Sequence, residues 1–573
     1  MEGEVSTDAM GYILDPDRVP AELEPFKDRL SKNFFEVRKR IISFIKEDII
    51  PGMPICAVQY REEVKKVKDR KPASPHEDPT YTNHAVWAAS PPIFDELRQK
   101  AKARGLYNFF LPEVGKLSVL EYAPICEILG AFGLCNVAMN CTAPDTGNME
   151  VLEKFGTEEQ KKRWLVPLLE GKIRSAYAMT EPGVASSDAT NISATITRDG
   201  DEYVINGHKW YISGACRPEC KLFIFLGRST SNEKNEKRHS QHSMILVPRD
   251  AEGVHIIRPL AVFGHIHDHA EILFENVRVP VSNMLLGEGR GFEIAQGRLG
   301  PGRIHHCMRT IGTAEQALDA IIHRVHQRVA FGKLLADQAT IRQTIAEARM
   351  DITKSRLLCY LAAVQADDHG FKAAKAFIAM TKVDAPRICQ KIIDEAIQIH
   401  GAHGVSQDSR LTDLYHHVRH VRLADGPDIV HLNTIAKEEL KRKSSVMGTS
   451  VSGNNKNVKK FGKFDQILPK VRARLWNCAH TVFLWWLNVS NVAAMNMFII
   501  NGTMRPDTRY SGVYSRRLCT DSKKGSLRAA TIFNFTDPYQ SCLHLDLTFN
   551  QLEMFKHCES QPVFQGLKVC SIQ

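Results

Sequence analysis

The segment YAMTEPGVASSDATN, from Tyr177 to Asn191, has the clearest chemical character in the chain. It gathers hydroxyl side chains, a Pro-Gly turn and small residues at the point where a helical pattern gives way to strand-like runs. Small side chains leave backbone N–H groups exposed, so such a loop can bind a phosphate or a flat heterocycle. A capped turn that leads into a strand has the same pattern, and the segment alone does not separate the two interpretations.

Two groups of residues raise the question of a metal ion. His265, His267 and His269 alternate along one predicted strand, and Cys216 and Cys220 lie four residues apart. Exposed loop histidines are usually solvated, and the cysteines have no second pair to complete a zinc site. We therefore predict no metal. The glycine-rich run LGEGRGFE does not follow the first strand of a βαβ unit, so we interpret it as a turn before a helix.

The elements that must position the Tyr177–Asn191 loop follow from hydrophobic periodicity. Helical spacing before the loop predicts a helical domain over residues 20–175, and short β-rich runs predict a β-domain over residues 176–285. Long amphipathic segments over residues 286–440 are typical of a helix bundle, whose outer faces could also serve oligomerisation. The expected fold class is mainly α with a central β-domain, followed by a basic tail over residues 441–573.

Composition excludes several protein classes. The 573 residues are 43% hydrophobic and 24% charged, as in soluble globular proteins of several domains, and unlike collagens, disordered chains or multi-span membrane proteins. The net charge of +10 belongs to the tail, because residues 441–573 hold 19 basic and 7 acidic residues. The 14 cysteines are spaced like reduced thiols. We find no targeting signal, so the compartment stays open.

The tail carries one long apolar stretch, CAHTVFLWWLNVSNVAAMNMFII, at residues 478–500. Its histidine, serine and asparagine residues make a membrane-spanning helix costly. Membrane association of the tail and an unstructured extension both stay open. Binding of nucleic acid by the tail rests on charge alone, and we predict none.

In order and spacing, TEPG, NGHKWYISGA, RVAFGK, QIHG and RLADGPD resemble the acyl-CoA dehydrogenase family over roughly residues 25–440. The phrases CTAPDTGNMEVL and GRLGPGRIHHCMRT are most similar to the branch called family members ten and eleven. The resemblance implies an N-terminal helical domain, a β-barrel or sandwich domain and a C-terminal four-helix bundle. It also implies an FAD cofactor and α,β-dehydrogenation of an acyl-CoA.

The resemblance makes Asp425 the catalytic base. It stands before Gly426, where most of the family has Glu before Gly, and Asp is one methylene shorter. The segment Leu299–His306, where some branches carry the base, contains no carboxylate. We expect apolar neighbours to raise the pKa of Asp425 in the substrate complex. The alternative role for Asp425 is that of a helix cap.

The resemblance also implies the ligand contacts. The predicted FAD contacts are Tyr177, Met179, Thr180, Gly183, Ser186, Tyr211, Ile212, Ser213, Arg328, Phe331, Gln338, Gln398, Gly401, Ala402, Pro427 and Asp428. The predicted substrate contacts are Ser186, Arg303 and Gly426. Arg328, Phe331 and Gln398 would reach the cofactor of a neighbouring subunit. Ala330 and Ala339 depart from the family pattern, which has Thr and Gln there.

The resemblance implies a medium to very long chain acyl-CoA oxidised to trans-2-enoyl-CoA in fatty-acid β-oxidation, in a mitochondrion or peroxisome. The implied partners are an electron-transferring flavoprotein and further copies of the chain, as a homodimer or homotetramer. Three alternatives stay open. The chain could be an oxygen-using acyl-CoA oxidase, a nitroalkane oxidase with an Asp base, or a non-catalytic flavoprotein.

Overall fold

The computed structural model describes residues 13–67, 90–229, 231, 237–263, 265–446, 528–533 and 542–547. The chain forms two compact units, Met1–Ser452 and Gly453–Gln573. In the second unit the described residues form an antiparallel pair, β10 (Arg528–Phe533) and β11 (Cys542–Leu547). The apolar stretch at 478–500 lies outside the described residues. Among the helices that the structure describes, none has the length and apolar character needed to cross a membrane.

The first unit begins with helices, as predicted. Ser118 starts α6 with a capping box, in which its hydroxyl accepts from the Glu121 backbone N–H and the Glu121 carboxylate accepts from the Ser118 N–H. The helices of this part are α1 (Lys32–Phe44), α2 (Ile50–Val67), α4 (Ile93–Ala103), α5 (Pro112–Gly115), α6 (Val119–Ala131), α7 (Gly133–Ala138), α8 (Asp145–Phe155), α9 (Glu158–Gln160) and α10 (Val166–Glu170). Short 3-10 or π segments η1 (Ala21–Arg29), η2 (Ile45–Ile49) and η4 (Lys161–Leu165) join them.

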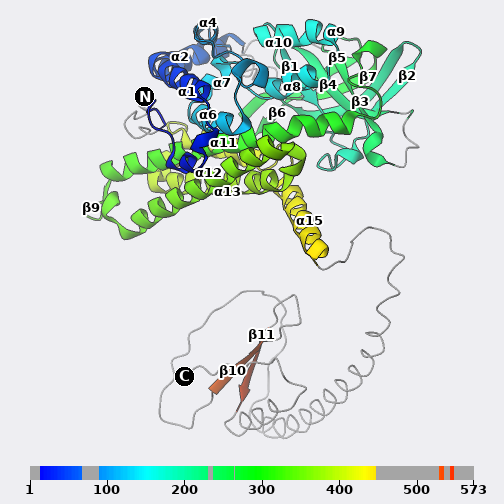
Figure 1. Ribbon diagram of the computed structural model, residues 1–573. Coiled ribbons are helices and arrows are strands. Elements are labelled where there is room, and N and C mark those ends of the chain that lie inside the picture. The colour runs from blue at the N-terminus through cyan, green and yellow to red at the C-terminus, as the bar shows by residue number, and fades with distance from the viewer. Residues whose placement is uncertain are drawn as a thin grey trace, which may run out of the picture. The chain divides into compact units, whose positions relative to one another are not determined.

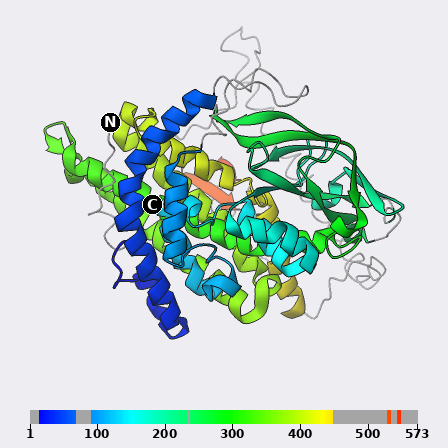
Figure 2. The same ribbon diagram turned by 90° about the horizontal axis from the view of Figure 1, so that it is seen from above.

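A seven-stranded sheet follows in the chain (Figures 1 and 2). Its strands are β1 (Arg174–Ala178), β2 (Thr195–Asp199), β3 (Glu202–Ile212), β4 (Cys220–Ser229), β5 (His242–Pro248), β6 (Val254–Val262) and β7 (His265–Pro280). Their order is β1-β4-β2-β3-β7-β6, with β5 paired to β4.

Strand β4 is a continuous apolar run because both of its faces are buried. Leu222, Ile224 and Leu226 join the core shared with the helices, whereas Phe223 and Phe225 join a second core formed by residues of the sheet. Alternate side chains of β4 therefore pack against the helices, and this packing holds the sheet in place. The neighbouring strands β1 and β3 carry predicted site residues.

The rest of the first unit is helical again: α11 (Gly291–Gln327), α12 (Ala339–Ala373), α13 (Lys375–His400), α14 (Leu411–Val421) and α15 (Asp428–Val446). A hairpin, β8 (Val329–Ala330) and β9 (Lys333–Leu334), joins α11 to α12. Figure 1 shows α11, α12 and α13 side by side and the hairpin at the end of these helices far from the sheet.

Helix α11 crosses α6 at very short range. A Cβ at Gly312 would lie 2.0 Å from the Glu127 carbonyl oxygen, and a Cβ at Gly130 would lie 2.0 Å from the Arg309 carbonyl oxygen. Only glycine fits at both positions, so this crossing fixes where α11 presents its other faces. The predicted fold class, mainly α with a central β-domain between two helical parts, is confirmed.

Candidate functional site

The predicted base lies in a sharp loop between α14 and α15. Asp425 has a φ of +55° and Gly426 a φ of +106°, so two consecutive residues adopt the left-handed region. Asp tolerates this region better than most residues, and a Cβ at position 426 would lie 2.8 Å from the Nε2 of His431. Gly426 is therefore required by the loop itself, which directs Asp425 towards α11.

Helix α11 supplies three of the residues next to Asp425, namely Gly302, Arg303 and His306. The Nε2 of His306 lies 3.5 Å from the Oδ2 of Asp425, and the Nε of Arg303 donates to the Asp425 backbone carbonyl at 2.9 Å. A Cβ at Gly302 would lie 3.6 Å from the same Oδ2, so the missing side chain leaves room beside the carboxylate. The structure brings together Asp425, Gly426 and Arg303, whose roles as base and substrate contacts stay predictions.

Burial and the neighbouring charges determine the protonation states of Asp425 and His306. Burial alone would raise the pKa of Asp425, but His306, Arg298, Arg303 and Lys382 together lower it below its ordinary value. Burial lowers the pKa of His306 to about 4 despite the neighbouring carboxylate. Because the pKa of Asp425 lies below its ordinary value and that of His306 is about 4, Asp425 is ionised and His306 neutral near pH 7, where the positive charges of Arg298, Arg303 and Lys382 stabilise the carboxylate. The predicted rise of the pKa in the substrate complex stays a prediction.

Arg298 connects the base to the Tyr177–Asn191 loop. Its guanidinium carbon lies 4.2 Å from the centre of the Tyr177 ring, and its Nε lies 3.3 Å from the Oδ1 of Asn148. Burial raises the pKa of Tyr177 to about 12, and its hydroxyl is buried without a hydrogen-bond partner among the described residues. An unpaired buried hydroxyl is costly, and a bound ligand would remove that cost.

The TEPG turn is fixed to β3 and β4 by a buried ion pair. Lys209, which is fully buried on β3, donates to the Met179 carbonyl at 2.9 Å, to the Glu181 carboxylate at 2.8 Å and to the Leu226 carbonyl at 2.7 Å. Glu181 also accepts from the backbone N–H and hydroxyl of Ser193 and from the backbone N–H of Ala194. These bonds hold the TEPG turn against β3 and β4.

Replacing Lys209 by Met is expected to lower the free energy of unfolding by about 2–3 kcal/mol, because Glu181 stays buried with three donors but no cation. Denaturant titration checks the loss. Lys221→Met, at an exposed lysine on β4, is the control and should change stability by less than about 0.5 kcal/mol. Equal stability of the two variants would contradict the role given to Lys209.

The TEPG turn has open space next to Gly183. A Cβ at Gly183 would meet nothing within 4 Å, and Ser186 accepts from the Glu181 backbone N–H at 3.0 Å. Thr180 donates to the Trp210 carbonyl at 2.5 Å, which leaves its oxygen lone pairs available to a ligand. The loop therefore has the exposed, small-residue surface expected from the sequence.

The β3 end lies beside this loop, since the Trp210 N–H donates to the Thr180 carbonyl. Tyr211 has a φ of +52° and is 48% exposed, whereas Ile212 is buried in the sheet core. The hydroxyl of Ser213 lies 2.9 Å from the Nδ1 of His269. Of these residues, Tyr211 and Ser213 are open to a ligand and Ile212 supports them.

The remaining predicted FAD contacts lie elsewhere on the chain. Five of them are exposed: Arg328, Phe331, Gln398, Gly401 and Ala402. Gln338 and Pro427 are half-buried. The Phe331 side chain is fully exposed on the β8–β9 hairpin. Asp428 binds Arg422 and Arg387 through its Oδ2, while its buried Oδ1 has no hydrogen-bond partner among the described residues.

Metal ligands do not gather in the described residues, where no group of three or more His, Cys, Asp or Glu side chains could hold an ion. The side chains of His265 and His267 lie outside the described ones, and Cys216 and Cys220 are buried. His417 and His420 stack edge to face on α14, with ring centres 4.8 Å apart. Burial lowers the pKa of His420 to about 3.

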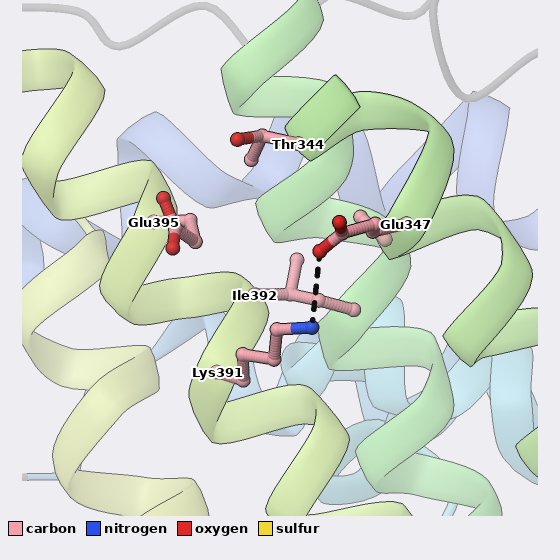
Figure 3. Close-up of a pocket in the computed structure, with 6 residues that line it drawn as sticks. Thr344, Glu347, Lys391, Ile392 and Glu395 are labelled. Carbon is pink, nitrogen blue, oxygen red and sulfur yellow. Dashed lines mark ion pairs between the residues drawn. The ribbon is translucent and has the colours of Figure 1, made fainter. Parts of the chain in front are cut away.

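A pocket between α12 and α13 is separate from this site. Its lining includes Thr344, Glu347, Lys391, Ile392 and Glu395, and the Lys391 ammonium lies 3.5 Å from the Glu347 carboxylate (Figure 3). It contains none of the predicted site residues.

Three residues near the base were missed from the sequence: Arg298, His306 and Lys382. The segment Leu299–His306 contains no carboxylate, but it carries the His306 imidazole that faces Asp425. Glycine at 302 was the available signal, because a missing side chain on a helix face leaves space for a group from another element.

Known protein families match three consecutive parts of the chain. Residues 59–172 match the acyl-CoA dehydrogenase N-terminal domain, residues 176–277 the middle domain and residues 289–440 the C-terminal domain. The chain is 54% identical over 366 residues to the probable acyl-CoA dehydrogenase FadE2 of Mycobacterium tuberculosis, covering 63% of this chain and 89% of that protein.

Vertebrate relatives are longer. The chain is 55% identical over 354 residues to acyl-CoA dehydrogenase family member 11 of Gallus gallus, covering 61% of this chain and 45% of that protein, so it spans less than half of that relative. Among solved structures, a putative acyl-CoA dehydrogenase from Mycobacterium abscessus has a TM-score of 0.66 at 43% identity and covers 72% of this chain and 99% of its own.

Proposed function

The chain belongs to the acyl-CoA dehydrogenase family, and from that premise we propose that it is an FAD-dependent dehydrogenase of medium to very long chain acyl-CoA. The product would be trans-2-enoyl-CoA, as in fatty-acid β-oxidation. The observation that carries the proposal is the position of the Asp425 carboxylate, which lies beside Gly302 and His306 of α11, the helix whose Arg298 stacks on Tyr177 of the Tyr177–Asn191 loop.

The reaction needs a base for a weakly acidic proton. In this proposal Asp425 accepts the α-proton of the thioester, and its largely buried position limits competition from water. Arg303 fixes the backbone of the base through the Asp425 carbonyl. Neutral His306 lies beside the carboxylate, with its Nε2 3.5 Å from the Oδ2 of Asp425. FAD, when bound, supplies the acceptor for the β-hydride.

The residues present fit FAD on chemical grounds. The buried hydroxyl of Tyr177, which has no hydrogen-bond partner among the described residues, and the open space at Gly183 offer a polar atom and room for a ligand at the same loop. Thr180 and Ser213 add hydroxyl oxygens beside them. Tyr211, Met179 and Ser186 would complete the wall around the ring, and Ser186 with Gly426 would contact the substrate.

The second half of the cofactor site is proposed to come from another copy of the chain, in a homodimer or homotetramer. The hairpin that carries Phe331 lies at the opposite end of the long helices from the sheet (Figure 1), so it is far from the TEPG turn of its own chain. Binding of the hairpin to another copy of the chain would bury the fully exposed Phe331 side chain, and large aromatic side chains often contribute most of the binding energy of an interface. Gln338, Gln398, Gly401 and Ala402 would lie against the neighbour's cofactor with Phe331.

Replacing the exposed Arg328 by Ala is expected to weaken FAD binding by about ten- to hundredfold, because charge-assisted bonds to the pyrophosphate would be lost. The ratio of flavin to protein absorbance after dialysis checks this, together with size-exclusion chromatography. His326→Ala, at an exposed position on α11, is the control and should keep its flavin. A flavin-replete monomer of the wild-type chain would contradict the proposed shared site.

Anaerobic titration of the FAD-loaded protein with acyl-CoA thioesters of increasing chain length tests the proposed activity. Bleaching of the flavin band by one range of chain lengths is the expected result. Absence of bleaching with every thioester would favour a nitroalkane substrate or a non-catalytic flavoprotein. Faster reoxidation by oxygen than by an electron-transferring flavoprotein would favour an acyl-CoA oxidase.

A further inference from the structure

The loop that carries Asp425 is held through its backbone carbonyls. The Asp425 carbonyl accepts from Arg303 and lies 3.3 Å from the Nε2 of His431. The Nζ of Lys382 donates to the Val421 carbonyl at 2.5 Å and lies 3.4 Å from the Gly426 carbonyl. Val421 ends α14 and Gly426 follows the base, so one ammonium group binds both ends of the loop.

The burial of Lys382 costs free energy. The residue lies on α13 with 1% of its surface exposed, and burial lowers its pKa. A buried ammonium group is costly unless it is well hydrogen-bonded, and carbonyl oxygens are its hydrogen-bond acceptors here. Stability of α13 alone does not require a lysine, because an apolar side chain of similar volume would fill this space without that cost.

The base needs accurate placement for a structural reason. Asp425 and Gly426 are two consecutive residues in the left-handed region, so the direction of the short Asp425 side chain depends on the conformation of this loop. Displacement of a reacting group by about 1 Å can reduce a rate by about a hundredfold. The loop must therefore be fixed on both sides of Asp425.

We propose that Lys382 is a positioning residue that clamps the Val421–Gly426 loop and so holds the Asp425 carboxylate at its reacting position. The proposal rests on the proposed function for its catalytic consequence, but the clamp itself can be measured without turnover.

The clamp also has an electrostatic consequence. The groups that face Asp425 are Arg298, Arg303, His306 and Cys307 from α11, Lys382 from α13, His431 from α15 and Tyr177 from β1, and His420 of α14 lies close to His306. Loss of the positive charge of Lys382 raises the pKa of Asp425. The base is then protonated up to a higher pH, so the acid limb of the rate profile moves to higher pH.

The test compares Lys382→Met, Lys382→Arg and the control Lys391→Met, an exposed lysine on the same helix. Hydrogen–deuterium exchange of the protein as purified, without substrate, reports the amides of Leu423, Ala424 and Asp428, which donate to the carbonyls of His420 and Arg422. In Lys382→Met these amides should exchange about ten times faster, with Lys391→Met unchanged and Lys382→Arg partly restored. If Lys382→Met does not fold, Lys382→Gln replaces it in both arms.

In the second arm, the FAD-loaded proteins are mixed anaerobically with a thioester that bleaches the wild type. Lys382→Met should bleach about a hundredfold more slowly at saturating thioester, with its acid limb at higher pH and the half-saturating concentration unchanged. Unchanged loop exchange, or an unchanged rate and pH profile, would overturn the proposal. If no thioester bleaches the wild type, the proposed function fails, and loop exchange alone decides whether Lys382 is a clamp.

Discussion

Replacing Asp425 by Asn is expected to slow flavin bleaching by the preferred acyl-CoA by about 10²- to 10⁴-fold. The amide has almost the same shape as the carboxylate but cannot accept the α-proton. The Arg303 bond to the backbone carbonyl stays in place, so the loop and the flavin content should be preserved. Stopped-flow absorbance under anaerobic conditions measures the rate.

The matched control for this variant is Asp413→Asn, at an exposed aspartate on α14. It should bleach at the wild-type rate. A wild-type rate in Asp425→Asn would exclude Asp425 as the base and would direct attention to His306, 3.5 Å away. Loss of flavin from Asp425→Asn would instead indicate that the residue supports the cofactor site.

Replacing Arg356 by Met is expected to cause the largest loss of stability, about 3–5 kcal/mol. Arg356 is 1% exposed and binds Glu127 through Nε and Nη2, Glu315 through Nη2 at 2.6 Å and Glu22 through Nη1 at 2.6 Å. The variant would leave Glu127 and Glu315 buried without this cation. Glu315 would keep Arg349, which limits the loss at that carboxylate.

The loss in Arg356→Met should depend on pH with a defined sign. Burial already raises the pKa of Glu127 even with Arg356 present, and removal of the cation raises it further. A carboxyl group whose folded pKa lies above its unfolded value destabilises the fold as pH rises. Denaturant titration should therefore show a larger loss at pH 8 than at pH 5.

The control for Arg356→Met is Lys354→Met on the same helix, where the lysine is 67% exposed. Its stability should change by less than about 0.5 kcal/mol at both pH values. Equal losses in the two variants, or a loss that grows towards acid pH, would contradict the buried network as the cause.

Much of the fold was predictable because its signals are local. The alternation of apolar runs gave the β-domain, and the two-face burial of β4 explains why its run is continuous and not alternating. The crossing of α6 and α11 was not predictable. It depends on Gly130 and Gly312, which lie 182 residues apart and carry no shared local pattern.

The candidate site divides in the same way. The TEPG turn and Asp425 are recognisable from short motifs, whereas Arg298, His306 and Lys382 act across long separations, from α11 and α13 onto the α14–α15 loop. Nothing around Lys382 in the sequence distinguishes it from a surface lysine. The exposed position of Phe331 also has no explanation within one chain.

The most direct test of the account is the rate of anaerobic flavin bleaching with the preferred acyl-CoA carrying deuterium at its α-carbon. Abstraction of the α-proton by Asp425 predicts slower bleaching with the α-deuterated thioester than with the protiated one in the wild type. It also predicts that one of the two α-deuterium atoms passes to solvent as the enoyl-CoA forms, while the other stays in the product. Bleaching that keeps both α-deuterium atoms in the product would contradict α,β-dehydrogenation and the assignment of Asp425 as its base.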